Sequence, residues 1–183
     1  MADLAARRMP VIAAREWLKI LPPADRWVLH GDTRARSRAA AAWGVGFSDA
    51  ACRALITGSR ATLWLGPDEY LLLDLAPDGG AALGSTLEQA LMGTPHALVD
   101  IGHRQFALEV SGEHAAAILN GACPLDLDPS AFPVHMCTRT VLAKADIVLW
   151  RTRPDAFHLE VWRSFAGYVG GLLEEIAREF YPP

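Results

Sequence analysis

A short pattern of residues occurs twice in this chain of 183 residues, once in each half. Residues 63–73 and residues 149–161 each contain a Trp, a Pro-Asp pair, an aromatic residue and an apolar stretch. The two Trp residues lie 86 positions apart and the two prolines lie 87 apart, which predicts that the second turn is one residue longer. Self-similarity at a fixed spacing indicates a duplicated supersecondary unit. The pattern therefore predicts two corresponding hairpins, and it favours a role in the scaffold over a role in chemistry.

The order of the predicted elements also indicates a duplication. Alternating apolar and polar residues predict strands, and apolar residues at spacings of three and four predict helices. The last helix has the clearest pattern, with Ser164 as its N-cap and an apolar stripe that includes Phe165, Val169 and Leu172. The predicted strands cover residues 26–30, 60–65, 69–75, 97–101, 105–110, 138–143, 146–151 and 157–162, and the earlier predicted helices cover 34–43, 83–92 and 114–120. Each half reads strand–helix–strand–strand–helix, so we expect an α+β fold of two such units related by a pseudo-twofold axis.

The length and composition fit one packed domain. A chain of 183 residues buries one substantial core, and the apolar content of 51% favours a well-filled core over a surface that a partner covers. Residues 1–24 are mixed in character and are predicted to form an N-terminal arm outside the packed fold. Residues 25–183 are predicted to form a single α+β domain of two similar halves, about 25–95 and 96–183.

The charge distribution argues against binding to nucleic acid. The formal net charge is −4, whereas a nucleic-acid footprint requires a basic patch or stripe. One basic cluster contains Arg34, Arg36 and Arg38, beside Arg26 and Arg53. Arginines two positions apart do not share one face of a helix, so this cluster is interpreted as a solvated surface.

The cysteines and the apolar runs bound the class of protein further. The three cysteines, Cys52, Cys123 and Cys137, have no CxxC spacing, so neither a disulfide framework nor a structural zinc site is predicted. No run approaches the roughly 18 apolar residues of a membrane-spanning helix, and no signal-peptide pattern opens the chain. A soluble, cytoplasmic protein is therefore expected.

The candidate reactive groups do not form a catalytic set. The six histidines show no metal-binding spacing, and no metal site is predicted. Asp100 and His103 are close enough in sequence to form an acid–base pair, but they are better interpreted as residues that fix a bend. Cys123 or Cys137 with His135 could form a nucleophile–base pair, although buried structural cysteines are the favoured interpretation. No catalytic residue is predicted.

Five motifs carry a resemblance to a known family. They lie in order along the chain at residues 64–72, 99–105, 123–127, 137–140 and 157–165. Together they resemble the gamma subunit of heterotetrameric sarcosine oxidase, over roughly residues 26–175.

The resemblance implies a function within a larger enzyme. Such a complex demethylates sarcosine oxidatively to glycine and passes the one-carbon unit to tetrahydrofolate. The resemblance places FAD, FMN, NAD, tetrahydrofolate and zinc in the partner alpha, beta and delta subunits, and no cofactor in this chain. The expected role is a non-catalytic one, in the assembly or stability of the complex. Methylglutamate dehydrogenase has a similar subunit, so the equivalent subunit of that enzyme is an alternative.

The second half more distantly resembles the folate-binding fold of aminomethyltransferases. That resemblance places Asp126 where those proteins have a functional aspartate, so an alternative function is a stand-alone folate-binding domain for one-carbon transfer. Two segments of the family's pattern are replaced here, by residues 143–148 and by residues 161–163 with a bulky Trp. Asp126 is therefore better interpreted as a turn residue beside Asp128 and Pro129.

Alternation in residues 157–162 predicts candidates for an interface. If Phe157, Leu159 and Val161 point into the core, the intervening residues point to the opposite face of the strand. A Trp beside charged groups is typical of an interface anchor, although another part of the same chain could equally cover it. The predicted interface residues are His158, Glu160 and Trp162.

Overall fold

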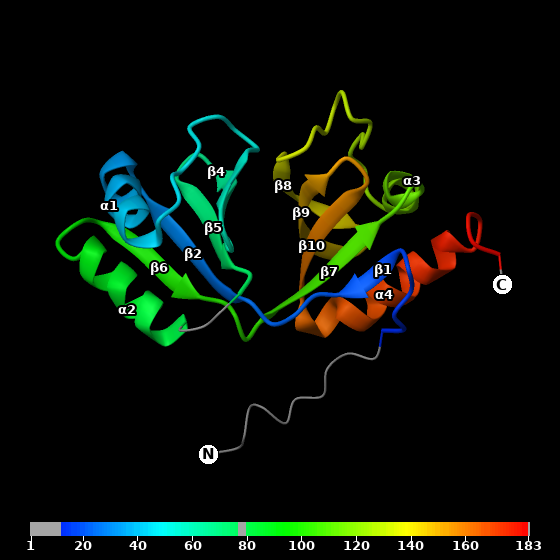
Figure 1. Ribbon diagram of the computed structural model, residues 1–183, viewed down its shortest axis with the longest axis horizontal. Helices are drawn as coiled ribbons and strands as arrows, with labels where there is room; N and C mark the ends of the chain where they lie inside the picture. Colours follow the sequence, from blue (N-terminus) through cyan, green and yellow to red (C-terminus); the bar gives the residue numbers. More distant parts are fainter. Residues whose placement is uncertain (1–11, 77–79, 183) are drawn as a thin grey trace, which may run out of the picture.

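The computed structural model describes residues 12–76 and 80–182 and shows two antiparallel sheets that face each other (Figure 1). The helices lie on the outer faces, with α1 and α2 on one side of the molecule and α3 and α4 on the other. The first part of the chain forms β1 (Leu18–Ile20), β2 (Asp25–Gly31), α1 (Thr33–Trp43), β3 (Ala54–Thr57), β4 (Arg60–Gly66), β5 (Glu69–Asp74), α2 (Gly80–Leu91) and β6 (His96–Asp100). The second part forms β7 (Gln105–Ser111), α3 (Ala115–Asn120), β8 (Cys137–Leu142), β9 (Ala145–Arg153), β10 (Ala156–Trp162) and α4 (Arg163–Ala177).

The two sheets correspond strand for strand. One has the order β3-β4-β5-β2-β6 and the other has the order β8-β9-β10-β7-β1. In each sheet the first strand of the unit leads into a helix, and the last hairpin leads into the second helix. The predicted α+β fold built from two similar units is therefore confirmed.

The limits of the halves differ from those expected from the sequence. β6, which was expected to begin the second half, pairs with β2 in the first sheet. β1 lies in the segment expected to be an unpacked arm, yet it pairs with β7, and Trp17 and Leu18 are buried in the second core. Both short strands add to a sheet whose other members are distant in sequence, which periodicity alone does not detect. Residues 1–11 of the expected arm lie outside the described residues.

The repeated pattern forms two hairpins, β4–β5 and β9–β10, whose turns have the same length. Pro67-Asp68 and Pro154-Asp155 occupy the same position in the two turns, and a register irregularity follows one residue away from the turn in both hairpins. The expectation of a longer second turn is therefore wrong. The tryptophans are out of step instead: Trp150 pairs with His158, whereas Trp64 pairs with Tyr70.

Because side chains alternate between faces of a strand, this offset of one residue changes the face on which each Trp lies. Trp150 is buried between the two sheets, in the position that Leu63 takes in the first hairpin. Trp64 is only partly buried, and its structural counterpart in the second hairpin is Arg151. The repeated Trp is a coincidence of sequence within hairpins that do correspond.

Local signals account for the helix limits. Asp32 caps α1 by accepting a hydrogen bond of 2.9 Å from the backbone N–H of Ala35, and Gly44 ends the helix in a left-handed conformation. α4 begins one residue before the predicted N-cap, Ser164. Its fully buried stripe runs through Ala166, Val169, Gly170, Leu173 and Ala177, so Phe165 lies at the surface.

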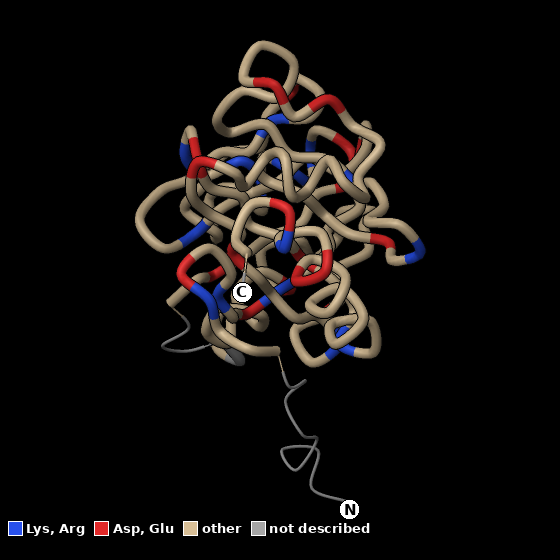
Figure 2. Tube along the Cα trace, turned by 90° about the vertical axis from the view of Figure 1, so that its right-hand side faces the viewer, with Lys and Arg blue, Asp and Glu red and all other residues tan. Residues whose placement is uncertain are grey.

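Three apolar clusters form the core. One lies under the helices of each half, and the third lies between the sheets, where Leu63, Leu71 and Leu73 of the first sheet meet Val148 and Trp150 of the second. Lys, Arg, Asp and Glu are interspersed over the side that carries the C-terminus (Figure 2). Among the described residues, no helix is long and apolar enough to cross a membrane.

Candidate functional site: a cavity between the two sheets

A buried ion cluster joins the facing surfaces of the two sheets. Arg26 on β2 donates a hydrogen bond of 2.7 Å from Nε to Oε2 of Glu160 on β10. His158 Nε2 lies 2.7 Å from the other carboxylate oxygen. The exposed fractions are 3% for Arg26, 4% for His158 and 1% for Glu160. The interpretation of Arg26 as part of a solvated basic surface was therefore wrong, because Arg26 is buried. Its partner could not be identified from the sequence, because it lies 134 positions away.

The surroundings of Glu160 keep it ionised. Burial by itself raises the pKa of Glu160, but the hydrogen bond from His158 and the charges of His158 and Arg26 outweigh burial and lower the pKa. A carboxylate held by two donors is poorly suited to accept a further proton, so its geometry favours a structural role over that of a general base.

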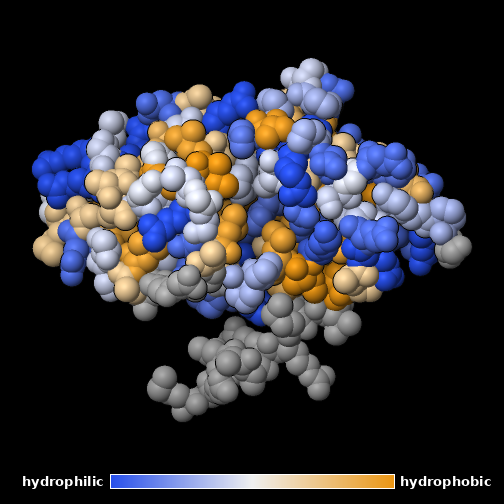
Figure 3. All heavy atoms as spheres, viewed as in Figure 1, coloured by the Kyte–Doolittle hydropathy of each residue, from blue (hydrophilic) through white to orange (hydrophobic). Residues whose placement is uncertain are grey.

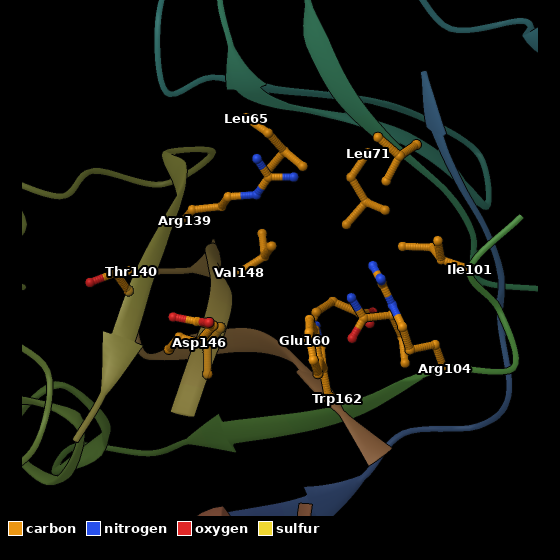
Figure 4. Close-up of a pocket in the computed structure, with 13 residues that line it drawn as sticks. Leu65, Leu71, Ile101, Arg104, Arg139, Thr140, Asp146, Val148, Glu160 and Trp162 are labelled. Atoms are coloured by element: carbon orange, nitrogen blue, oxygen red, sulfur yellow. The ribbon is translucent and has the colours of Figure 1, made fainter. Parts of the chain in front are cut away.

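A cavity of about 380 Å³ lies beside this cluster, between the sheets (Figure 4). Its apolar walls come from both halves, with Leu65 and Leu71 facing Val148 across the space. Glu160, Trp162 and Arg104 lie close together in the lower part of the view. A second cavity of about 360 Å³ has Arg26 and His158 in its wall, so the ion cluster divides the space between the sheets.

The polar groups of the first cavity differ in how well they are paired. Arg139 Nη1 donates to Glu69 Oε2 over 2.7 Å, and this hydrogen bond lowers the pKa of Glu69. Arg104 places its guanidinium 5.0 Å from the ring centre of Trp162. Gln105 is 8% exposed, and its Oε1 is buried without a hydrogen-bond partner. An unpaired buried acceptor costs free energy, because burial removes the hydrogen bonds that the oxygen would make to water.

The cavity combines apolar walls with charged side chains. Among its described lining residues there is no cysteine, histidine, serine or lysine. The described part of the chain also contains no group of three or more side chains placed to hold a metal ion. The apolar walls and the charged groups of Arg104, Arg139 and Asp146 can hold a molecule in a fixed orientation.

The predicted site residues are dispersed. Asp126 is exposed in the loop after α3, and its Oδ1 accepts a hydrogen bond of 2.9 Å from the backbone N–H of Asp128, as a turn residue does. Asp126 is not among the residues that line the cavity. His158 and Glu160 are buried against the first half of the same chain, so only Trp162 presents an exposed surface to a partner.

The remaining polar candidates have local roles. Asp100 Oδ1 accepts a hydrogen bond of 2.8 Å from Gly102 N–H, which fixes the bend between β6 and β7. Cys137 is buried, and desolvation raises its pKa to about 12, which keeps the thiol protonated and unreactive. Sequence reasoning missed Arg26, Arg104 and Gln105. Only the alternation around Gln105 in β7 gave a signal, since it placed this residue on the face opposite Phe106.

The protein has an α+β fold like that of aminomethyltransferases, with a cavity between its two sheets. In fold the chain is similar to the glycine cleavage system aminomethyltransferase T from Bartonella henselae, with a TM-score of 0.64. That similarity covers 85% of this chain and 44% of that chain at 14% identity. A model described as "Sarcosine oxidase, gamma subunit family" matches residues 30–179. The chain belongs to the sarcosine oxidase gamma subunit family, which confirms the resemblance found in the sequence.

Individual relatives agree with this assignment. Sarcosine oxidase subunit gamma of Corynebacterium sp. (strain P-1) is 38% identical over 120 residues, which is 66% of this chain and 58% of that protein. The Arthrobacter sp. subunit is 37% identical over 67% of this chain and 59% of that protein. The chain thus spans less than two thirds of the length of these two relatives. A chain in the structure "Heterotetrameric Sarcosine Oxidase from Corynebacterium sp. U-96 in complex with pyrrole 2-carboxylate" is similar over 100% of this chain and 95% of its own length, with a TM-score of 0.83 and 31% identity.

Proposed function

We propose that this chain is the gamma subunit of a heterotetrameric sarcosine oxidase and that it acts in the assembly or stability of the complex. The observation that carries the proposal is the similarity to a chain of the Corynebacterium sp. U-96 oxidase over the whole fold. A similarity that covers both halves supports a shared mode of assembly better than a similarity of one segment would.

In this proposal the chemistry belongs to the partner alpha, beta and delta subunits. They demethylate sarcosine oxidatively to glycine, transfer the one-carbon unit to tetrahydrofolate, and hold FAD, FMN, NAD and zinc. The pairing of Glu160 with Arg26 and His158 supports a non-catalytic role for this chain, because both oxygens of the buried carboxylate beside the cavity are already hydrogen-bonded. The free state of Cys52, Cys123 and Cys137 supports a cytoplasmic location.

Co-expression of the four subunits, with and without this chain, tests the proposal. We expect that omitting the chain lowers the yield of complex, its flavin absorbance and its sarcosine-dependent oxygen consumption. An oxidase that assembles without this chain, with full flavin content and activity, would overturn the proposal. Turnover of N-methylglutamate in place of sarcosine by the intact complex would assign the chain to methylglutamate dehydrogenase instead.

A further inference from the structure

An exposed aromatic surface lies at the start of α4. Trp162 is the last residue of β10 and directly precedes α4, and Phe165 and Tyr168 lie three residues apart in the first turns of α4, with ring centres 6.5 Å apart. Their exposed fractions are 43%, 37% and 42%. Figure 3 shows a group of apolar side chains at the lower right of this view, over the region that α4 occupies in Figure 1. Clustered exposed aromatic rings are typical of surfaces that bind another protein.

The charge beside this surface is positive. Arg104 stacks on Trp162, and no carboxylate oxygen of the described residues forms an ion pair with its guanidinium. The shallow hollow that adjoins the rings is lined by His103, Arg104, Trp162, Arg163 and Ser164, none of which is acidic. Trp, Tyr and Arg are also the residue types that contribute most to the affinity of protein interfaces. The surface is therefore complementary to an acidic partner.

The surface continues into the cavity between the sheets. Arg104 and Trp162 belong to both, and they lie close together in Figure 4. Apolar residues that include Leu71 line the same cavity. A molecule complementary to these groups carries a carboxylate for Arg104 and an apolar side chain for the cavity. An extended polypeptide segment carries both.

We propose that Trp162, Phe165, Tyr168 and Arg104, with the cavity behind them, bind an acidic extended segment of a partner subunit. Its carboxylate pairs with Arg104, and an aliphatic or aromatic side chain fills the cavity. This inference rests on the proposed function, because it assumes that partner subunits exist. A small carboxylate alone would occupy the cavity but leave the three exposed rings uncovered.

The test uses the intact complex, purified through a tag on another subunit, and measures how much of this chain is retained. We expect Arg104→Glu and Phe165→Asp each to lower retention at least tenfold, and 0.5 M salt to weaken retention of the wild type. Arg178→Glu is the charge-matched control, since Arg178 is exposed at the other end of α4 and pairs only with Glu175 among the described residues. The control should be retained like the wild type, and all variants should keep the wild-type unfolding midpoint.

The possible outcomes separate the two proposals. If the wild type itself is not retained, the proposed function fails. If the wild type is retained and the correctly folded Arg104→Glu and Phe165→Asp variants are retained equally well, the docking surface is overturned. A homodimer of the isolated chain that Trp162→Ala dissociates would assign the surface to a second copy. Loss of retention in Arg104→Glu without loss in Phe165→Asp would reduce the site to an anion contact. Either result would overturn the docking of a segment.

Discussion

At the scale of single residues, the ion cluster replaces an apolar layer. In the first hairpin the positions that correspond to His158 and Glu160 are occupied by Leu71 and Leu73, both buried between the sheets. A buried ion pair gains little net stability over such leucines, because desolvation offsets most of the attraction. The ion pair instead makes the packing specific, because Arg26 and Glu160 can pair at only one relative placement of the two sheets.

Removing the carboxylate should therefore be costly. In Glu160→Gln, Arg26 stays buried without a counter-charge, and we expect the free energy of unfolding to fall by about 3–5 kcal/mol near neutral pH. Urea unfolding measures this change. Glu175→Gln is the matched control, because that carboxylate is exposed and pairs with exposed Arg178, so its loss should cost well under 1 kcal/mol.

The stability that Glu160 contributes is expected to depend on pH. The pKa of Glu160 in the folded protein is lowered from 4.5, so its contribution to stability is complete above about pH 4.5 and is lost as the pH falls through the folded-state pKa. The difference in stability between the wild type and Glu160→Gln should thus shrink with acidification. A difference that stays constant or grows below pH 4.5 would contradict the assignment of an ionised Glu160.

At the scale of elements, the edge strands are where the structure departs from expectation. β1 has three residues, yet Leu18 is fully buried and pairs with Val110 of β7. Such a strand contributes through its contacts with the second core, because three residues carry almost no periodicity of their own. The predicted long strands and helices, by contrast, each contained enough residues to show a pattern.

Truncation of the β1 side chain tests its place in the core. Leu18→Ala should destabilise the protein by about 2–5 kcal/mol, as expected for a fully buried leucine, and chemical denaturation measures the loss. Lys19→Ala lies on the same strand with an exposed side chain, so it should change stability by less than about 0.5 kcal/mol. Equal small effects of both substitutions would mean that β1 is an unpacked arm after all.

At the scale of the whole molecule, the duplication is circular. The first unit ends with β6 beside β2, whereas the matching strand of the second unit, β1, comes from the opposite end of the chain. Residues near the two ends of the described chain are close in space, since the rings of Trp17 and Tyr181 stack with centres 6.0 Å apart. Arg15 also forms an ion pair of 3.2 Å with Glu174 of α4.

This proximity predicts that the chain tolerates circular permutation. A variant that begins at residue 22 and carries residues 12–21 after residue 182, through a short Gly/Ser linker, should fold to the same structure. Circular dichroism and thermal unfolding would compare it with the wild type, and we expect a midpoint within about 5 °C. The control places the same segment after residue 182 with Leu18→Ala; it should lose stability as the unpermuted Leu18→Ala does, and failure of both permuted chains to fold would refute the circular arrangement.

Features that repeat at short range could be predicted from the sequence. Alternation and helical periodicity were sufficient for the α+β class and most elements, the repeated pattern indicated the two hairpins, and the five motifs carried the family resemblance. The alternation also placed His158, Glu160 and Trp162 on one face of a strand, but it did not show what packs against that face.

The pairings between distant residues are seen only in the folded structure. These are Arg26 with Glu160, β1 with β7, β6 with β2, and the cavity with Arg104, Gln105 and Trp162 around it. The physical reason is that the periodicity of a segment identifies the face on which each side chain lies, whereas the partner of that side chain depends on how the two sheets pack. The packing of two sheets is settled by the summed contacts of the whole core rather than by any one segment.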